Sequence, residues 1–208
     1  MKIAVLGATG RTGRPLVAEL LRRGHHVTVL VRDPAGAVLP GAVELVAGDV
    51  RDADALRRAV AGADAVVSAL GPRKGDPTLH RDAAALIVGV LRDAGVRRFV
   101  GVSGAGVDVE GDRKSRRDRV VSWVIQHLPG DAVRDKVVEY GVWRDSGLDW
   151  TLVRPPRLTD GPAVGAVEHH AGTSPRSTSI RRADLAAFLA DEVEQGRYLR
   201  QAPLVAQA

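Results

Sequence analysis

The chain has 208 residues, 45% of them hydrophobic and 26% charged, and carries a formal net charge of +5. This composition is typical of a globular protein, and the length predicts one domain spanning residues 1–208. The absence of cysteine excludes disulfides, thiolate metal sites and a cysteine nucleophile. No apolar run approaches the ~20 residues of a membrane span, and an expected strand at Lys2 leaves no room for a signal peptide. We therefore expect a cytoplasmic protein without a membrane partner.

The basic residues are dispersed among acidic ones rather than gathered in one patch. The densest basic stretch, residues 113–119 (RKSRRDR), has no aromatic residue within it. Surfaces that bind nucleic acids typically combine basic patches with aromatic side chains. We therefore expect a solvated loop or helix face here, and no nucleic-acid partner.

The first half of the chain alternates apolar strands with amphipathic helices. A helix that Gly24 ends follows the first strand, a helix that Asp52 caps runs to Ala61, and a long helix covers residues 78–94. Further strands are expected at residues 26–31, 43–47, 65–70 and 98–102. This alternation predicts an α/β fold, a Rossmann-type doubly wound parallel sheet with helices on both faces.

The pattern loosens after Ser103. We expect a loop over residues 104–112, helices over 115–128 and 132–146, and a strand over 150–153 that two prolines end. Residues 161–179 are rich in Gly, Pro, Ser and Thr, which predicts a loop or small hairpin within a small substrate-side region at about 154–180. A helix over residues 182–195 and a short Ala-rich tail close the chain.

A glycine-rich turn, Gly7-Ala8-Thr9-Gly10-Arg11-Thr12-Gly13, joins the first expected strand to the first helix. In a dinucleotide site the glycines allow a tight turn, a close approach of backbone N–H groups to the pyrophosphate, and close packing of helix on strand. The phosphates lie at the helix N-terminus, where unpaired N–H groups and the dipole favour anions. The turn and its context predict nucleotide binding.

The carboxyl ends of the other strands supply the remaining candidates, because ligands of open parallel sheets bind across that edge. In chain order, these candidates are Arg32, Gly48-Asp49-Val50, Leu70-Gly71-Pro72-Arg73, Ser103-Gly104 and Arg154-Pro155-Pro156-Arg157. Since they share one edge, they can share one ligand.

Arg32 is the most discriminating of these candidates. NAD sites place a carboxylate near the end of the second strand to hold the ribose 2′-hydroxyl, whereas the planar fork of an arginine suits a 2′-phosphate. Arg11 can add a second cation. We therefore expect NADP in preference to NAD, although Asp33 offers an acid if the register shifts by one residue, and a solvated strand end is the alternative role for Arg32.

The other candidates have two roles open. Asp49 either accepts a hydrogen bond from the adenine amino group, with Val50 packed on the ring, or caps the following helix. Leu70 and Gly71 can line the middle of the cofactor, and Arg73 can reach its phosphates. Lys136 either reaches the nicotinamide ribose or is an ordinary helical lysine.

The motifs GATGRTG, VLVR, GDV, VSALG, FVGVSGAG and DSGLDWTLVRPP occur in this order. Together they resemble an atypical short-chain dehydrogenase/reductase, in the compact branch with biliverdin-IXβ reductase/flavin reductase and NAD(P)H-binding nitrogen-regulator-like proteins. The resemblance runs from residue 1 to about 195. It implies phosphate contacts from Thr9, Gly10, Arg11, Thr12 and Gly13 and a 2′-phosphate contact from Arg32. It also implies that Lys136 is the family's lysine. Gly7 and Pro155, which follow the first and the sixth expected strands, are further residues that we expect to bind the cofactor.

The sequence departs from that family at the position of the proton-donating residue. The family's proton-donating tyrosine stands four residues before its lysine, and here that position is Ala132. Tyr140 lies on the wrong side of Lys136, and we expect it to pack. Ser103 aligns with the family's serine region. His169 and His170 are the late-loop side chains suited to proton donation. No side chain stands at a spacing that would help them hold a metal.

The leading hypothesis is a reductase that moves hydride from NADPH to a planar acceptor such as a flavin, quinone or bilin. Ser103 and Lys136 would be the catalytic residues, and Arg157 would hold an anionic group of the substrate. Such a chain is expected to be a monomer or a small homo-oligomer with a small-molecule substrate. The alternative is a non-catalytic NADP-sensing regulator that binds a protein partner, which the missing tyrosine favours. An epimerase or lyase is a third, weaker hypothesis.

Overall fold

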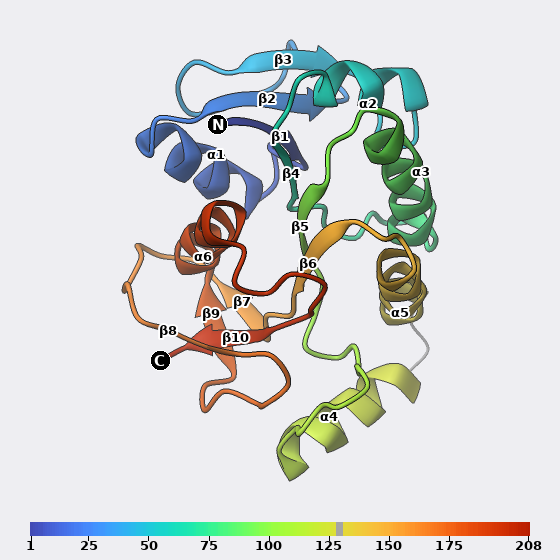
Figure 1. Cartoon of the computed structure of the whole chain (residues 1–208). Coiled ribbons are helices and arrows are strands. Elements are labelled where there is room, and N and C mark those ends of the chain that lie inside the picture. The colour runs from blue at the N-terminus through green and yellow to red at the C-terminus, as the bar shows by residue number, and fades with distance from the viewer. Residues whose placement is uncertain (128–130) are drawn as a thin grey trace.

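The computed structural model describes residues 1–127 and 131–208. Its centre is a six-stranded, all-parallel sheet in the order β3-β2-β1-β4-β5-β6 (Figure 1). The strands are β1 (Lys2–Leu6), β2 (His26–Val31), β3 (Glu44–Ala47), β4 (Ala65–Ser68), β5 (Arg98–Val102) and β6 (Asp149–Val153). This arrangement confirms the predicted Rossmann-type α/β fold, and the strand order reverses between β1 and β4, where such folds bind ligands.

Helices cover both faces of the sheet and bury two separate apolar cores. On one face α1 (Gly13–Arg22) packs beside α6 (Arg182–Gln195). The other face carries α2 (Ala53–Val60), α3 (Leu79–Asp93) and α5 (Asp131–Arg144). Nearly continuous apolar strands such as β4, in which all four residues are buried, follow from being covered on both faces.

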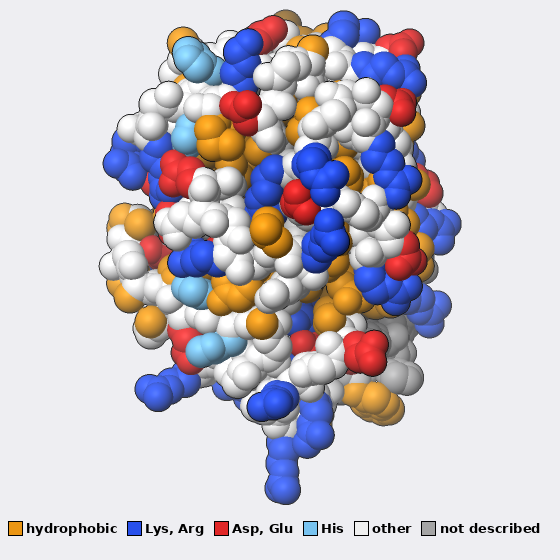
Figure 2. All heavy atoms as spheres, in the orientation of Figure 1, with side chains coloured by type: hydrophobic (Ala, Val, Ile, Leu, Met, Phe, Trp, Pro, Cys, Tyr) orange, Lys and Arg blue, Asp and Glu red, His pale blue; other side chains and the backbone are white. Residues whose placement is uncertain are grey.

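Helix α4 (Arg116–His127) lies apart from the sheet, at the lower end of the molecule in Figure 1. The predicted end of this helix at Pro129-Gly130 lies outside the described residues. On the face drawn in Figure 2, basic and acidic side chains are mixed over most of the surface. Within the described part of the chain, no helix combines the length and apolar content needed to cross a membrane.

The segment after β6 forms two small sheets instead of one loop. Strand β7 (Arg157–Thr159) pairs in parallel with β9 (Ser179–Arg181), and β8 (Val167–His170) pairs antiparallel with β10 (Leu204–Gln207). The expected loop or small hairpin over residues 161–179 is therefore wrong, because β8 pairs with β10 and β9 pairs with β7. The tail is a buried strand, with Val205 and Ala206 fully inaccessible to solvent.

The tail also follows the free edge of β6. The backbone N–H of Leu152 donates to the carbonyl of Gln201 at 3.1 Å, and that of Arg154 donates to the carbonyl of Pro203 at 2.8 Å. These bonds satisfy edge groups that would otherwise face solvent. They fix the tail, and with it the β8–β10 sheet, against the carboxyl end of β6, which is the edge where the sequence predicts the candidate site residues.

Candidate functional site

The glycine turn has the geometry that its sequence predicts. Gly7 has φ of +76°, and a Cβ there would lie 2.9 Å from backbone atoms of Ala69 on the neighbouring strand segment. Gly13 begins α1, and a Cβ there would lie 2.1 Å from the carbonyl oxygen of Gly7. Only glycine fits either position. The turn therefore brings the N-terminus of α1 to the point between β1 and β4 where the strand order reverses.

A pocket of 260 Å³ opens beside this turn. It is lined by the turn and by the segments after β2, β3 and β4, and it brings together the predicted residues Gly7, Thr9, Gly10, Arg32, Val50, Leu70, Gly71 and Arg73. The predicted residues Arg11, Thr12, Gly13 and Asp49 do not line it. Arg32 is exposed, and its guanidinium has no hydrogen-bond or ion-pair partner among the described residues. An unpaired cation at the end of β2 is free to bind an anion.

A charged network joins the segments after β3 and β4. Arg73 donates to Asp49 at 2.9 Å, and Asp76 receives bonds from both Arg73 and Arg51. Burial raises the pKa of Asp49, but the hydrogen bonds from Arg73 and from the Arg51 backbone outweigh it and hold that pKa below its ordinary value. The Arg73 guanidinium, predicted to reach phosphates, is thus already paired.

The structure decides between Asp49 and Asp52 as the helix cap. The Asp52 carboxylate accepts from the backbone N–H groups of Asp54 and Ala55 at 2.9 and 3.1 Å, so Asp52 caps α2 as predicted. Asp49 accepts from the Arg51 backbone and from Arg73. The capping role for Asp49 is therefore wrong, and its adenine contact stays a prediction.

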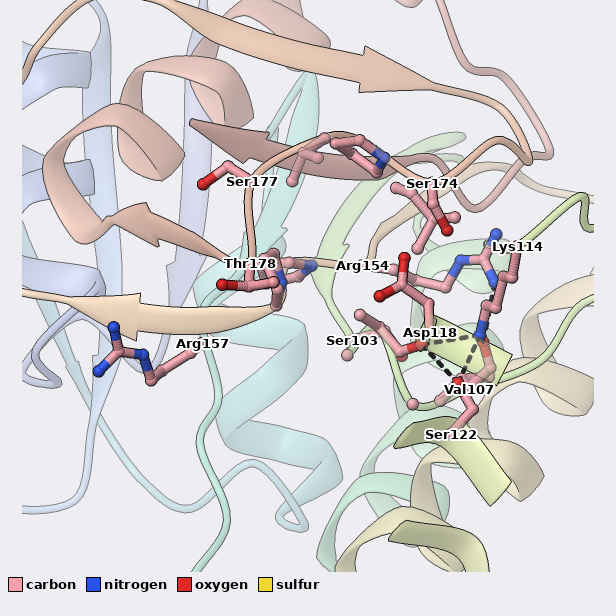
Figure 3. A pocket seen from close by; sticks show the side chains of 18 of the residues that line it. Ser103, Val107, Lys114, Asp118, Ser122, Arg154, Arg157, Ser174, Ser177 and Thr178 are labelled. Atoms are coloured by element: carbon pink, nitrogen blue, oxygen red, sulfur yellow. Dashed lines mark hydrogen bonds between the residues drawn. The ribbon is translucent and has the colours of Figure 1, made fainter. Parts of the chain in front are cut away.

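A second pocket, of 490 Å³, lies beyond the ends of β5 and β6 (Figure 3). This volume is within the range of small-molecule sites. Its walls come from the segment after β5, helices α4 and α5, the two prolines after β6, the 174–178 segment and β10. Seven of the predicted residues line it together, namely Ser103, Gly104, Lys136, Arg154, Pro155, Pro156 and Arg157.

Ser103 stands out in this pocket because its hydroxyl is unsatisfied. Its Oγ is buried and has no hydrogen-bond partner among the described residues. Its backbone N–H donates to the carbonyl of Val153 at 2.7 Å, which fixes the residue between β5 and β6. A buried hydroxyl without a partner costs free energy, so its presence in a pocket points to a ligand group that completes it.

Lys136 reaches the same pocket from α5. Its Nζ donates to the carbonyl of Val102 at 2.8 Å and lies 3.0 Å from Oε2 of Glu139. The lysine therefore lies directly beneath the segment that carries Ser103. Ala132, which stands where the family's tyrosine is expected, has a side chain outside the described residues.

The two arginines after β6 differ sharply. Arg154 is fully buried, and its guanidinium donates to both carboxylate oxygens of Asp112 at 2.6 and 2.7 Å. Arg157 is exposed, and its side chain has no partner among the described residues. Figure 3 shows Arg157 at the opposite end of the pocket from Arg154. Only Arg157 of this pair is free to bind an anionic group.

Lys114 is a pocket residue that the sequence did not reveal. The stretch 113–119 was expected to be solvated, which is wrong for Lys114, whose side chain is only 3% exposed. Its Nζ donates to the carbonyls of Ala105 and Val107 at 2.7 and 3.0 Å and to Asp108 at 2.6 Å. Lys114 therefore ties the segment after β5 to the start of α4. Nothing in the local sequence separates it from its basic neighbours.

The late histidines lie outside the pocket. His169 belongs to β8, where its Nδ1 lies 2.7 Å from the Tyr198 hydroxyl and burial lowers its pKa. His170 lies 3.4 Å from Glu168. Tyr140 packs edge-on against Trp150, as expected. Over residues 1–127 and 131–208, no three His, Asp or Glu side chains gather in a way that could hold a metal ion.

Two curated proteins illustrate the sequence similarity of this chain to known proteins. YwnB of Bacillus subtilis (strain 168) is 28% identical over 206 residues, which cover 93% of this chain and 92% of YwnB. The 3-diazoavenalumate denitrifying reductase of a Streptomyces species is 39% identical over 116 residues, covering 50% of this chain but 38% of that protein.

A solved structure shows the same fold. A short-chain dehydrogenase/reductase of Veillonella parvula, crystallised in complex with NADP, superposes with a TM-score of 0.83 at 24% identity, covering 99% of this chain and 94% of that one. Residues 7–196 match the model of a family described as NAD(P)H-binding. With this match and its glycine turn at the strand-order reversal, the chain belongs to the NAD(P)H-binding family.

Proposed function

We propose that this protein is an NADPH-dependent reductase that transfers hydride to a planar small-molecule acceptor, such as a flavin, a quinone or a bilin-like molecule. The observation that carries the proposal is the unsatisfied Ser103 hydroxyl beside Lys136, in a pocket at the same sheet edge as the glycine turn. The Streptomyces relative named as a reductase adds support. We also propose that the whole chain is one domain, with residues 154–180 on the substrate side.

The pockets support an assignment of residues to the two ligands. The α1 N-terminus and Arg32 would hold the phosphates and the adenine end of the dinucleotide, while Ser103, Lys136 and Pro155 would hold its nicotinamide end. The dinucleotide supplies the hydride when bound. Ser103 would donate its hydroxyl hydrogen to an acceptor oxygen or nitrogen, and Lys136 would donate one N–H.

The proposed proton source is solvent. The chain has Ala132 at the tyrosine position, and the late histidines lie away from the pocket, so no described side chain there is an obvious general acid. Acceptors that take their proton from water tolerate that arrangement. The unpaired Arg157 favours acceptors that carry a carboxylate or phosphate.

The preference for NADPH over NADH rests on Arg32, with Arg11 as a second cation. Arg11 is already paired with Asp160, so Arg32 is the freer of the two. Arg32→Ala should lower the ratio of NADPH to NADH affinity by about 10- to 100-fold, the value of a charge-assisted hydrogen bond. Titration calorimetry with both cofactors measures it, and an unchanged ratio would remove the 2′-phosphate assignment.

Turnover is tested by mixing the protein and NADPH with FMN, a quinone or a bilin and following the loss of NADPH. We expect oxidation with at least one acceptor. Ser103→Ala should lower kcat about 10- to 1,000-fold, a larger effect than the accompanying loss of NADPH affinity, while Thr28→Ala, a remote hydroxyl deletion on β2, should change neither. If NADPH binds and no acceptor oxidises it, the reductase proposal fails.

That outcome would favour the second candidate, a non-catalytic NADP-sensing regulator. Ala132 in place of the family's tyrosine is the observation that supports it. The regulator predicts tight cofactor binding without turnover, and it predicts that Ser103→Ala leaves the regulatory output intact.

A further inference from the structure

A buried carboxylate lies beside Lys136, and the proposed function gives it no role. Glu139 stands three residues after Lys136 on α5, so both side chains project from one face of the helix. The Glu139 side chain is 10% exposed and that of Lys136 is 14% exposed, with 3.0 Å between Nζ and Oε2. Taking two charges out of water to form a buried ion pair costs free energy. The position of this pair beneath a ligand pocket therefore indicates a role in that pocket.

The surrounding charged groups are already committed to other partners. Asp135, also buried on α5, accepts from the backbone N–H groups of His80 and Arg81 at 2.7 and 3.1 Å, and so completes the first turn of α3. Burial and the nearby Lys136 charge lower the pKa of His80 to about 3, so that imidazole is neutral at pH 7. Glu139 is therefore the carboxylate left to balance Lys136 among the described residues of α3 and α5.

The geometry of the ammonium shows what this balance achieves. A lysine ammonium has three N–H donors. One is bound by the carbonyl of Val102, the residue before Ser103, while Oε2 of Glu139 lies 3.0 Å from Nζ as an ion pair without hydrogen-bond alignment. The ammonium therefore keeps an N–H for the pocket that Lys136 and Ser103 line together.

We propose that Glu139 is a positioning residue, whose buried carboxylate anchors Lys136 so that its remaining N–H faces the dinucleotide bound along the sheet edge. Glu139 acts through the lysine and touches no ligand itself. The inference rests on the proposed contact of Lys136 with the cofactor, and it requires no turnover.

The proposal gives cofactor binding a specific pH dependence. Burial raises the pKa of Glu139, partly opposed by Lys136, with Asp135 adding to the rise. Glu139 therefore takes up a proton at a higher pH than an ordinary glutamic acid, and the anchor is lost as the pH falls through that raised value. NADPH affinity should fall on the acid side, beyond the loss that protonation of the cofactor phosphate causes in every variant.

The test is a double-mutant cycle read by the Kd for NADPH, measured by titration calorimetry. Glu139→Gln should weaken NADPH binding about 10-fold or more, as expected for a charge-assisted contact. It should also remove the additional fall in NADPH affinity at acid pH, which we call the extra acid limb. Glu139→Asp should recover part of the loss. Asp145→Asn, which removes an exposed ion pair with Arg144 on the same segment, should change nothing.

The decisive comparison uses Lys136→Met as background. If Glu139 acts only through the lysine, adding Glu139→Gln to Lys136→Met weakens binding no further. A loss of the same size in both backgrounds, or no loss in the native one, overturns the proposal. Lys136→Met with unchanged Kd would instead refute the Lys136 contact itself, while the acceptor panel tests turnover separately.

If Glu139→Gln does not fold, the pH dependence of the Kd for NADPH is compared between the native protein and Lys136→Met. The extra acid limb of the native protein should be absent from Lys136→Met, in which no ammonium remains to be anchored. Persistence of that limb in Lys136→Met would overturn the role assigned to Glu139.

Discussion

Replacing Arg154 with methionine should destabilise the protein severely, because it breaks a fully buried ion pair. Arg154 is 0% exposed and Asp112 side-chain exposure is 9%, so the substitution leaves a carboxylate with little access to water. The guanidinium also donates to the carbonyls of Ala202 and Val107 at 2.7 and 2.8 Å. Removing one partner of such a pair costs about 3–5 kcal/mol, and the orphaned carbonyls add to this cost.

That loss corresponds to a fall in Tm of roughly 6–20 °C for a chain of this size. The free energy of unfolding is measured by urea titration, with Arg57→Met as the control. Arg57 pairs with Asp54 at 2.6 Å, but those side chains are 55% and 78% exposed. The control should cost less than about 1 kcal/mol. A loss for Arg154→Met no larger than the control would refute the claim that burial makes this pair essential.

Three further predictions concern the turn, a helix cap and a buried histidine. Gly13→Ala should cost at least about 2 kcal/mol through overlap with Gly7, whereas Gly89→Ala, in open space on α3, should stabilise by about 1 kcal/mol; thermal melts that move in one direction for both would contradict the geometry. Asp52→Ala should cost about 1 kcal/mol in urea unfolding by uncapping α2, and an unchanged midpoint would count against the cap. Burial lowers the pKa of His80 from 6.5 in the unfolded chain to about 3 in the folded one. The free energy of unfolding is therefore unaffected by this group above pH 6.5 and falls as the pH drops from 6.5 towards 3, by up to ~5 kcal/mol. His80→Leu should therefore show a shallower acid loss in urea midpoints taken at pH 7 and pH 4, and equal slopes would refute this.

The central sheet could be predicted because its signals are local. Apolar runs such as that of β2, the cap at Asp52 and the glycine turn each lie within a few residues of one another, and the structure has each at or within two residues of the expected position. The strand ends follow from the same runs. Adjacent elements then define the edge on which Arg32 and Ser103 lie.

The part of the chain that follows β5 could not be predicted in the same way, because its contacts are distant in sequence. Strand β10 pairs with β8 across more than 30 residues, and its short Ala-containing run resembles an ordinary tail. Lys114 is buried only because the segment after β5 folds over it. Which basic residue turns inward is decided by that packing, and the sequence of residues 113–119 holds no sign of it.

The pairing of β10 also sets an order of events during synthesis. A chain emerges from the ribosome N-terminus first while a domain folds as a unit, and the strands from β1 to β6 have all emerged once Val153 has. The free edge of β6 and the strand β8 both lack their partner segment until residues 201–207 emerge. A ribosome that stalls just before that point would hold a nascent chain whose six sheet strands have emerged but whose β6 edge and β8 are unpaired, a state that chaperones or proteases can recognise.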